Sequence, residues 1–266
     1  MNFIRHYLLA VQFFTRIPIT GRLAQWTGFS TAMLRASAAH FPGVGWLVGG
    51  VAAGVYALVF MALPDTLFTP LVAAVLSTVA SVLLTGGFHE DGLADVADGL
   101  GGSADRQRAL EIMKDSRVGA FGAMALMLAL LAKVSLLAML GASDLLLACA
   151  ALLAGHVLSR GLPLVLIRVL PHVGDAASSK SKPLADQISG PALAAAFLWC
   201  FGAMVLVAWT LDATFFIAGG ACAGLALFWM GRLFERRLQG FTGDALGATQ
   251  QVCEIAFYLG AAFAAV

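Results

Sequence analysis

Charged residues are scarce in this sequence, and their scarcity argues against a water-soluble globule. Only 12% of the 266 residues are charged and 60% are hydrophobic, with a mean hydropathy of +0.89. Soluble domains average about a quarter charged residues. So large an apolar fraction suits helices in lipid, which satisfy their backbone polar groups internally. Because apolar segments cover most of the chain, the sequence predicts a single polytopic membrane domain over residues 1–266.

Other features that would indicate a protein class are also missing. The net charge of +1 argues against a nucleic-acid partner bound through bulk electrostatics. The four cysteines, Cys149, Cys200, Cys222 and Cys253, form no Cys-x-x-Cys pair, so we expect neither a zinc site nor a disulfide framework. There is no Walker A motif and no dinucleotide-binding fingerprint, so no stored nucleotide cofactor is indicated.

The first 19 residues are typical of an interfacial helix and not of a cleavable signal. Arg5, His6 and Arg16 interrupt the apolar residues, and no small-residue cleavage site follows. We expect an amphipathic helix that lies at the membrane surface and ends near Pro18.

Seven apolar segments approach the length of about 20 residues that a membrane-spanning helix needs. They are Phe41–Ala62, Thr69–Phe88, Val118–Leu140, Leu145–Leu170, Pro191–Leu211, Ala213–Gly231 and Ala245–Ala265. The last segment contains Gln250, Gln251 and Glu254, so whether it crosses the membrane or re-enters is left open. The expected fold is an all-α bundle of six to seven transmembrane helices with an N-terminal interfacial helix.

Basic residues fall on alternate connections between these segments. The short connections at 64–65, 143–144 and 212 carry no Lys or Arg, whereas 13 of the 16 basic residues lie in the N-terminal arm and the other connections. Positive residues stay on the cytoplasmic side. We therefore expect a bacterial inner-membrane protein whose N-terminus and active-site loops, near 86–117, 171–190 and 232–244, are cytoplasmic.

Two kinds of residue inside the segments bear on packing. Gly45 and Gly49, like Gly50 and Gly54, have the small-xxx-small spacing that lets helices approach closely. Lys133 lies deep in a segment and should face a partner or a wet cavity, as should Arg160 in another segment. Ion pairing between helices is the simpler expectation for both.

The connection after the second segment carries an acidic cluster. Asp91, Asp95 and Asp98 stand at i, i+4 and i+7, which places three carboxylates on one helical face. Like charges so placed repel, and a divalent cation reverses that repulsion. Carboxylate oxygens are ligands that Mg²⁺ or Mn²⁺ prefers, with water and substrate phosphates completing the shell. The pattern predicts a metal site, with Glu90 as a further candidate ligand and His89 beside it.

Two further stretches carry candidate residues. Lys114 and Arg117 are one helical turn apart and suit a phosphate, and Asp115 between them is another candidate ligand. Later, Thr242-Gly-Asp forms a polar turn in which Asp244 is also a candidate N-cap. Gln251 and Glu254 follow Asp244 on roughly one helical face, which should point into the bundle. We interpret Thr242, Asp244 and Glu254 as substrate-binding candidates.

These blocks together resemble the cobalamin synthase family, also called adenosylcobinamide-GDP ribazoletransferases. The likeness rests on the runs 13–18, 41–45, 86–102, 114–122 and 242–248, so it extends over essentially the whole chain. One departure is Gln239, where a second glycine is expected before Gly240.

The resemblance implies a Mg²⁺-dependent transferase that completes the nucleotide loop of vitamin B12. Adenosylcobinamide-GDP would supply the phosphoryl group, and α-ribazole or its 5′-phosphate the attacking hydroxyl; adenosylcobalamin or its 5′-phosphate and GMP would be the products. In this interpretation the aspartates hold the metal, Lys114 and Arg117 clamp phosphate oxygens, and His89 or Asp91 takes the proton. Lipid surrounds the chain, and assembly with itself or with other nucleotide-loop enzymes is left open, as are the base and phosphorylation state of the ribazole.

Two other functions compete with this interpretation. CDP-alcohol phosphotransferases also place aspartates at the membrane face, but their usual pattern has an Ala-Arg pair where Asp95 follows Ala94 here. A transporter would use intramembrane Lys133, Arg160 and Glu254 to line a pathway, and it would show internal repeats, which this sequence lacks. The polar residues gather instead at one membrane edge, which favours an enzyme.

Overall fold

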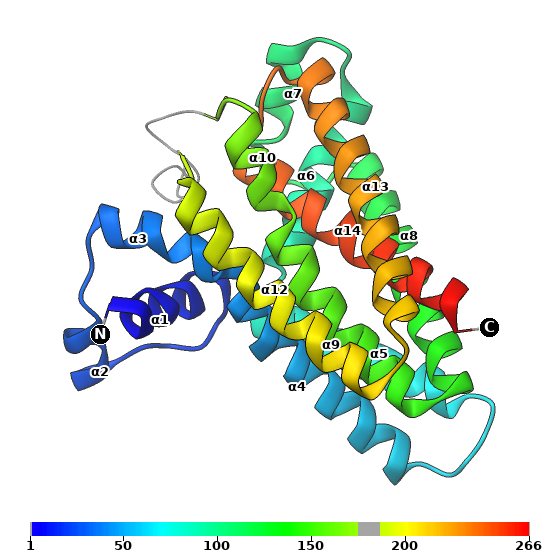
Figure 1. The fold of residues 1–266 in the computed structure, drawn as a ribbon. Helices are drawn as coiled ribbons and strands as arrows, with labels where there is room; N and C mark the ends of the chain where they lie inside the picture. The colour runs from blue at the N-terminus through cyan, green and yellow to red at the C-terminus, as the bar shows by residue number, and fades with distance from the viewer. Residues whose placement is uncertain (1, 175–186, 266) are drawn as a thin grey trace.

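The computed structural model describes residues 2–174 and 187–265, which fold almost entirely into helices (Figure 1). The helices are α1 (Asn2–Phe14), α2 (Gly21–Thr27), α3 (Thr31–Ser37), the 3₁₀ turn η1 (Ala38–His40), α4 (Phe41–Ala62), α5 (Thr69–Thr85), α6 (Phe88–Gly102), α7 (Arg106–Ile112), α8 (Ala120–Ser143), α9 (Leu145–Gly161), α10 (Pro163–Val169), α12 (Gly190–Thr210), α13 (Ala213–Arg237) and α14 (Gly243–Ala264). Most of the predicted 171–190 loop lies outside the described residues.

Five helical stretches in the described part of the chain are long and apolar enough to cross a membrane. They are Thr31–Ala62, Ala120–Ser143, Leu145–Val169, Gly190–Thr210 and Ala213–Arg237. A sixth is reached only if α5 and α6 are taken together, although these two helices are bent by 90°. The all-α membrane bundle is confirmed, with a number of spans at or just below the lower end of the expected range.

The bend between α5 and α6 comes from two adjacent glycines. Gly86 and Gly87 have φ angles of +71° and +70°, in the left-handed region that residues with a Cβ avoid. The segment expected at Thr69–Phe88 therefore ends as a helix at Thr85, and α6 leaves in a new direction. This turn directs the acidic run into a separate helix.

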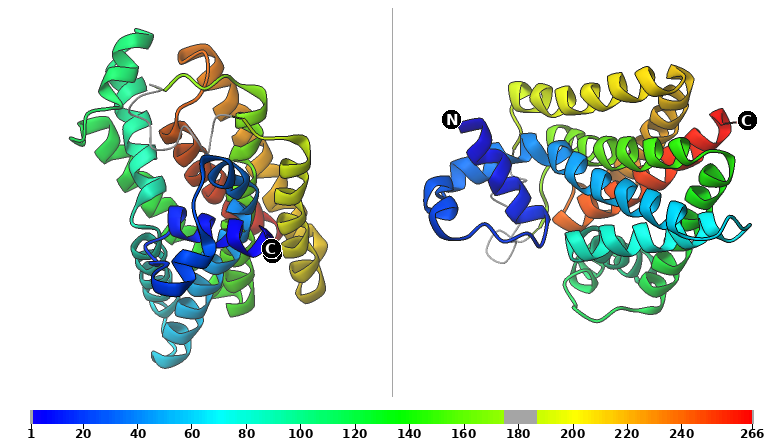
Figure 2. Two further views of the ribbon diagram at one scale, coloured as in Figure 1. Left: turned by 90° about the vertical axis from the view of Figure 1, so that its left-hand side faces the viewer. Right: turned by 90° about the horizontal axis from the view of Figure 1, so that it is seen from below.

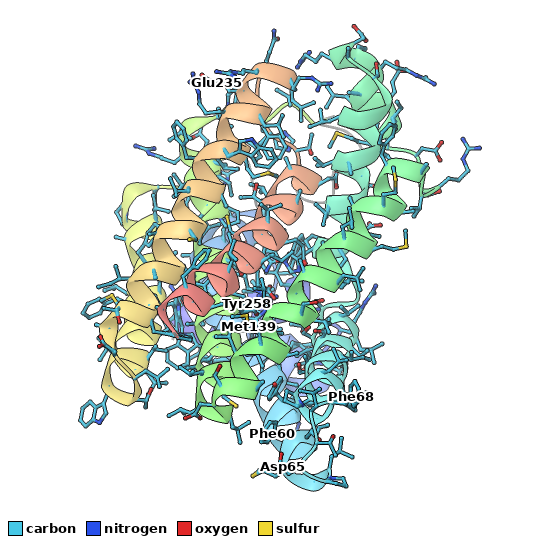
Figure 3. The ribbon with its side chains drawn as sticks, turned by 90° about the vertical axis from the view of Figure 1, so that its right-hand side faces the viewer. Phe60, Asp65, Phe68, Met139, Glu235 and Tyr258 are labelled. Atoms are coloured by element: carbon cyan, nitrogen blue, oxygen red, sulfur yellow. The ribbon has the colours of Figure 1, made fainter. Side chains whose placement is uncertain are left out.

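The last segment, for which crossing of the membrane was left open, forms α14, which lies inside the bundle and is not among the five candidate spans. It packs against α13, α6, α9 and α8. Gln250, Gln251 and Glu254 are all buried, as the polar stripe predicted. Figure 3 shows Tyr258 of α14 in the middle of the molecule. These polar groups lower the hydropathy of α14 and are satisfied by neighbouring helices.

The N-terminal arm forms a small group of helices beside the bundle (Figure 2). α1 buries Leu9, Val11 and Phe14 in its second half, while Phe3 and Ile4 are exposed at 57% and 55%. The helix is amphipathic as expected, but it ends at Phe14, before Pro18. The exposed apolar residues suit a helix that lies in the membrane surface.

The two classes of connection lie at opposite ends of the bundle. Figure 3 shows Asp65, in the α4–α5 connection that lacks Lys and Arg, at one end and Glu235, near the basic end of α13, at the other. Between them, large apolar side chains such as Leu128, Leu198 and Phe228 are exposed by 67–69% on the outward faces of the spans. This distribution suits a bundle whose middle contacts lipid.

We predict that the glycine-mediated crossing of α4 and α9 can be tested with a matched pair of alanines. A Cβ at Gly45 would lie 2.5 Å from the carbonyl oxygen of His156 and 2.7 Å from Cα of Val157, whereas one at Gly50 would meet nothing within 4 Å. Gly45→Ala should lower the melting temperature in detergent, at an overpacking cost of about 1–3 kcal/mol. Gly50→Ala should be neutral or slightly stabilising, because alanine favours the helix. Equal melting temperatures would contradict this packing.

Candidate active site

The site is organised by a close crossing of α6 and the start of α14. A Cβ at Gly92 would lie 2.8 Å from the carbonyl oxygen of Asp244, and one at Gly247 would lie 3.4 Å from Cα of His89. At position 92 only glycine permits this approach, whereas a Cβ at position 247 would make an ordinary van der Waals contact. The crossing joins two polar motifs that are about 150 residues apart in the sequence.

Three carboxylates lie near this crossing, within reach of one another's charge. Asp91 is exposed, and Asp95 and Asp244 are partly buried. Burial raises the pKa of Asp95 to about 7, and the charges of Asp244 and Asp91 add to the shift. Burial also raises the pKa of Asp244, with a smaller contribution from Asp91. The three carboxylates therefore repel one another, and a cation would relieve that repulsion.

Asp98, the third member of the predicted acidic face, has a different environment. Its carboxylate accepts hydrogen bonds from the backbone amides of Gly119, at 2.7 Å, and Gly122, at 2.8 Å. These amides begin α8, where unpaired N–H groups and the helix dipole favour a negative charge. Asp98 thus anchors α8 to α6. Its predicted role as a metal ligand stays a prediction.

The carboxylates of this site suit Mg²⁺ better than a metal ion whose ligands all come from the protein. In residues 2–174 and 187–265, no three His, Cys, Asp or Glu side chains converge closely enough to hold a metal ion. Mg²⁺ usually takes one or two carboxylates and completes its shell with water and substrate phosphates. Asp91, Asp95 and Asp244 fit that mode, because their negative charges repel one another and no ion pair joins them to another side chain of residues 2–174 and 187–265.

The basic candidates lie on the connection between α7 and α8. Arg117 bonds Asp115 through Nε at 3.0 Å, and its side chain is 87% exposed. These hydrogen bonds lower the pKa of Asp115 to about 2. Asp115 therefore pairs with its neighbour here, and its predicted role as a metal ligand is untested. Lys114 follows α7 on the same exposed connection.

Thr242 starts α14 as its N-cap, accepting a hydrogen bond from the amide of Ala245 at 3.2 Å. The cap belongs to Thr242 and not to Asp244, whose Oδ2 accepts a hydrogen bond from Oγ1 of Thr242 at 3.4 Å. Before it, Phe241 is held by paired backbone bonds with Pro171 and Val173. Gln239 adopts a φ of +57°, a left-handed conformation that favours glycine. This explains physically why glycine is expected there.

Glu254 lies in a buried polar cluster that the sequence did not reveal in full. Its carboxylate is 2.6 Å from Nζ of Lys133 and 3.2 Å from Nδ1 of His156. Gln250 and Tyr258 also donate to it, at 2.6 Å and 3.0 Å. The expected ion pairing of Lys133 is confirmed, and His156 is a partner that sequence reasoning missed. Glu254 is fully buried by these protein groups, so its substrate-binding role stays a prediction.

The cluster reaches the acidic helix through two amide side chains. Gln251 donates to Oε1 of Glu90 at 3.1 Å and to Gln250 at 2.9 Å. Arg160, also fully buried, contacts His156 at 2.9 Å and lies 5.8 Å from the ring centre of Phe41. Glu90 thus links α6 to α14, while Asp91, the next residue, remains exposed.

His89 sits among aromatic rings on the other side of α6. It is 1% exposed, and its ring stacks on Phe41 with centroids 5.6 Å apart. Phe14 stacks on the same phenylalanine at 4.0 Å. His89 lines a pocket together with these rings and the first turns of α14. These phenylalanines belong to runs on which the family resemblance rests, but the sequence analysis gave them no role in a site.

Comparisons with known proteins agree on one family. The family model described as Cobalamin-5-phosphate synthase matches residues 6–262. A protein of Polaromonas naphthalenivorans named adenosylcobinamide-GDP ribazoletransferase is 68% identical, over 98% of this chain and 99% of its own. Proteins of the same name from Polaromonas sp. strain JS666 and Albidiferax ferrireducens are 69% and 65% identical, each over 98% of this chain and at least 97% of their own. No solved structure matches the chain.

We predict that replacing Asp95 and replacing Asp98 by alanine change the melting temperature in opposite directions in metal-free buffer. Asp98→Ala should lower the melting temperature, because losing an N-cap costs about 1–2 kcal/mol. Asp95→Ala should raise it at pH 8, because it removes a repelled charge. The pKa of this carboxyl group is about 7 in the folded protein and near 4 in the unfolded chain. Its contribution to stability is therefore lost as pH rises from about 4 to about 7. The gain from Asp95→Ala should therefore shrink at pH 5, and a gain independent of pH would contradict the assignment.

Proposed function

Because the chain belongs to the Cobalamin-5-phosphate synthase family, we propose that it joins adenosylcobinamide-GDP to α-ribazole or its 5′-phosphate. It is a transferase of cobalamin biosynthesis, and it releases GMP. The observation that carries the proposal is the α6–α14 crossing, which brings Asp244 to Asp91 and Asp95. A group of mutually repelling carboxylates at the edge of an apolar bundle suits a substrate that carries a metal-bound pyrophosphate.

The carboxylates would hold Mg²⁺ between the protein and the pyrophosphate. When bound, the metal supplies positive charge that stabilises the transferred phosphoryl group and the departing GMP. Asp91 and Asp244 approach from different helices, so the α6–α14 crossing fixes the position of both. Lys114 and Arg117 lie on an exposed connection, from which they would contact non-bridging phosphate oxygens.

The reaction exchanges one phosphorus–oxygen bond for another. The ribose hydroxyl of the ribazole attacks the phosphorus next to cobinamide, and the bond to the GMP oxygen breaks with its electron pair. The hydroxyl proton passes to a base on the first turns of α6. Asp91 and His89 are the candidates. Both candidates lie on α6, so the proton transfer needs no residue from the lipid-facing surface of the bundle.

The end of the bundle that carries the basic connections would face the cytoplasm, where both substrates are charged and water-soluble. The basic residues of Arg106–Arg117 and of the α13 terminus surround this end, in accord with the positive-inside rule. Lipid would cover the exposed apolar faces of the spans. Self-association and contacts with other enzymes of nucleotide-loop assembly remain compatible with the exposed connections.

We predict that turnover depends on the metal and on the aspartates together. The purified protein in lipid should release GMP and form a cobalamin product with Mg²⁺ but not with EDTA. Asp91→Ala, Asp95→Ala and Asp244→Ala should each reduce turnover by roughly 100-fold or more, because metal charge stabilisation supplies several kcal/mol. Glu111→Gln is the matched control, since its exposed pair with Arg108 contributes little. Wild-type activity in Asp95→Ala would refute the metal assignment.

We predict an orientation that single cysteines at the two ends of the bundle can test, in a variant that lacks the four natural cysteines. Ala104→Cys, in the exposed α6–α7 connection, should react with an impermeant maleimide only in inside-out vesicles. Asp65→Cys, in the exposed α4–α5 connection, should react in intact spheroplasts. The opposite pattern would place the carboxylates on the outer face and refute the orientation.

A further inference from the structure

Two arginines join the C-terminal end of α6 to the C-terminal end of α13. Nη2 of Arg237, the last residue of α13, donates to the carbonyl oxygens of Leu100, at 3.1 Å, and Ser103, at 2.7 Å. In return, Nε of Arg106, the first residue of α7, donates to the carbonyl oxygen of Leu238 at 2.7 Å. Figure 1 shows α7 beside the C-terminal end of α13. Each arginine thus reaches across to the backbone of the other segment.

The accepting carbonyl groups lie where two helices end. α6 ends at Gly102, and Ser103 after it has an extended backbone. The last carbonyls of a helix have no partner within the helix and carry the negative end of its dipole, so a guanidinium group suits them. Both arginines are partly buried, whereas Arg108 and Arg236 near them are exposed. The two partly buried arginines therefore cap each other's helices, although their charge alone would also suit a phosphate.

These caps hold more than two helix ends. A Cβ at Gly99 of α6 would lie 2.9 Å from the carbonyl oxygen of Ala109 of α7, so these two helices are packed closely together. The bond from Arg106 therefore also holds the second half of α6. On the other side, residues 238–242 form a short connection from α13 to α14, and Phe241 within it is fully buried. A fixed end of α13 thus also fixes the start of α14.

The arginines attach α6 to the α13–α14 segment at a second place. The first place is the crossing near Gly92, where the backbone of Asp244 approaches α6. Attachment at one place leaves two helices able to pivot about it, whereas attachment at two places fixes their relative direction. Asp95 lies on α6 between Gly92 and Leu100, so it is held from both sides. The distance between the carboxylates of Asp95 and Asp244 therefore depends on both attachments.

We infer that Arg106 and Arg237 form a reciprocal clamp that positions the Mg²⁺ site, because it holds the half of α6 that carries Asp95 against the start of α14. The two arginines are positioning residues and act through the backbone, without touching the substrate. The inference rests on the proposed function for the identity of the metal and the substrate. The clamp itself rests on the contacts between α6, α7 and α13.

The first measurement follows the geometry of the metal-free protein in lipid nanodiscs. Spin labels are attached at Ala104→Cys and Glu235→Cys, which are both exposed, in a variant that lacks the natural cysteines. Pulsed electron paramagnetic resonance should give one narrow distribution of distances between the two labels. Arg106→Met and Arg237→Met should each broaden this distribution, because methionine is also long and unbranched but donates no hydrogen bond.

Matched controls come from the same two helices. Arg108→Met and Arg236→Met remove the same charge from exposed positions, and they should leave the distribution narrow. Arg237→Lys guards against misfolding. Because one nitrogen of Arg237 donates to both carbonyls, an ammonium group can replace it, and this variant should keep the label distance and the melting temperature of the parent protein.

The second measurement separates positioning from substrate binding. Arg106→Met and Arg237→Met should raise the Mg²⁺ concentration for half-maximal turnover by about 10-fold or more, because residues that orient metal ligands from behind have effects of this size. The KM for adenosylcobinamide-GDP at saturating Mg²⁺ should stay unchanged. Arg108→Met, Arg236→Met and Arg237→Lys should keep the Mg²⁺ requirement of wild type.

Other roles of the two arginines predict different results. A contact with phosphate would raise the KM for adenosylcobinamide-GDP and leave the label distribution narrow, and a merely structural role would lower the melting temperature without changing the Mg²⁺ requirement. Either result, or an equal rise in the Mg²⁺ requirement of Arg236→Met, would overturn the clamp. Broadened distributions in a protein without turnover would uphold the contacts between the helix ends and refute the proposed function together with the positioning of Mg²⁺.

Discussion

The ion cluster around Glu254 is the interaction on which the arrangement of the bundle depends. In an apolar interior, an unpaired carboxylate is very costly, so Glu254 has to be met by partners from several helices. Lys133 of α8 and His156 of α9 supply them, and α14 adds Tyr258. Removing one partner from such a buried pair typically costs about 3–5 kcal/mol. This need for partners keeps α14, a relatively polar helix, in the centre of a bundle whose outer surface is apolar.

The position of α14 in turn decides where the carboxylates meet. Gln251 ties α14 to Glu90 of α6, and glycines at the crossing let the two backbones touch. Carboxylates of the same helix crossing therefore have opposite electrostatic environments. In the interior both carboxylate oxygens of Glu254 have protein partners, whereas Asp91, Asp95 and Asp244 lie where their negative charges repel one another. Paired charges stabilise the scaffold, and the repelling ones at its edge are available for a cation and a pyrophosphate.

Several features of the site could be predicted from local pattern, and others could not. The spacing of Asp91, Asp95 and Asp98 correctly indicated one helix, because i, i+4 and i+7 positions share a face. The same spacing did not show that Asp98 caps α8, since that contact depends on where a distant helix begins. The polar stripe on α14 correctly predicted burial of Gln251 and Glu254. Its partner His156 was missed, because a single histidine in an apolar segment carries no local signal.

The sequence by itself determined that this protein lies in lipid and which reactive groups it carries. Hydropathy requires lipid, and the acidic and Thr-Gly-Asp motifs supply the reactive groups. Only the tertiary structure decided which of these groups meet. Asp244 joins Asp91, and the phenylalanines of α1 and α4 close around His89, because helix packing brings together residues that lie far apart in the chain. Side-chain periodicity acts over a few turns of one helix, whereas a site is built where several helices cross.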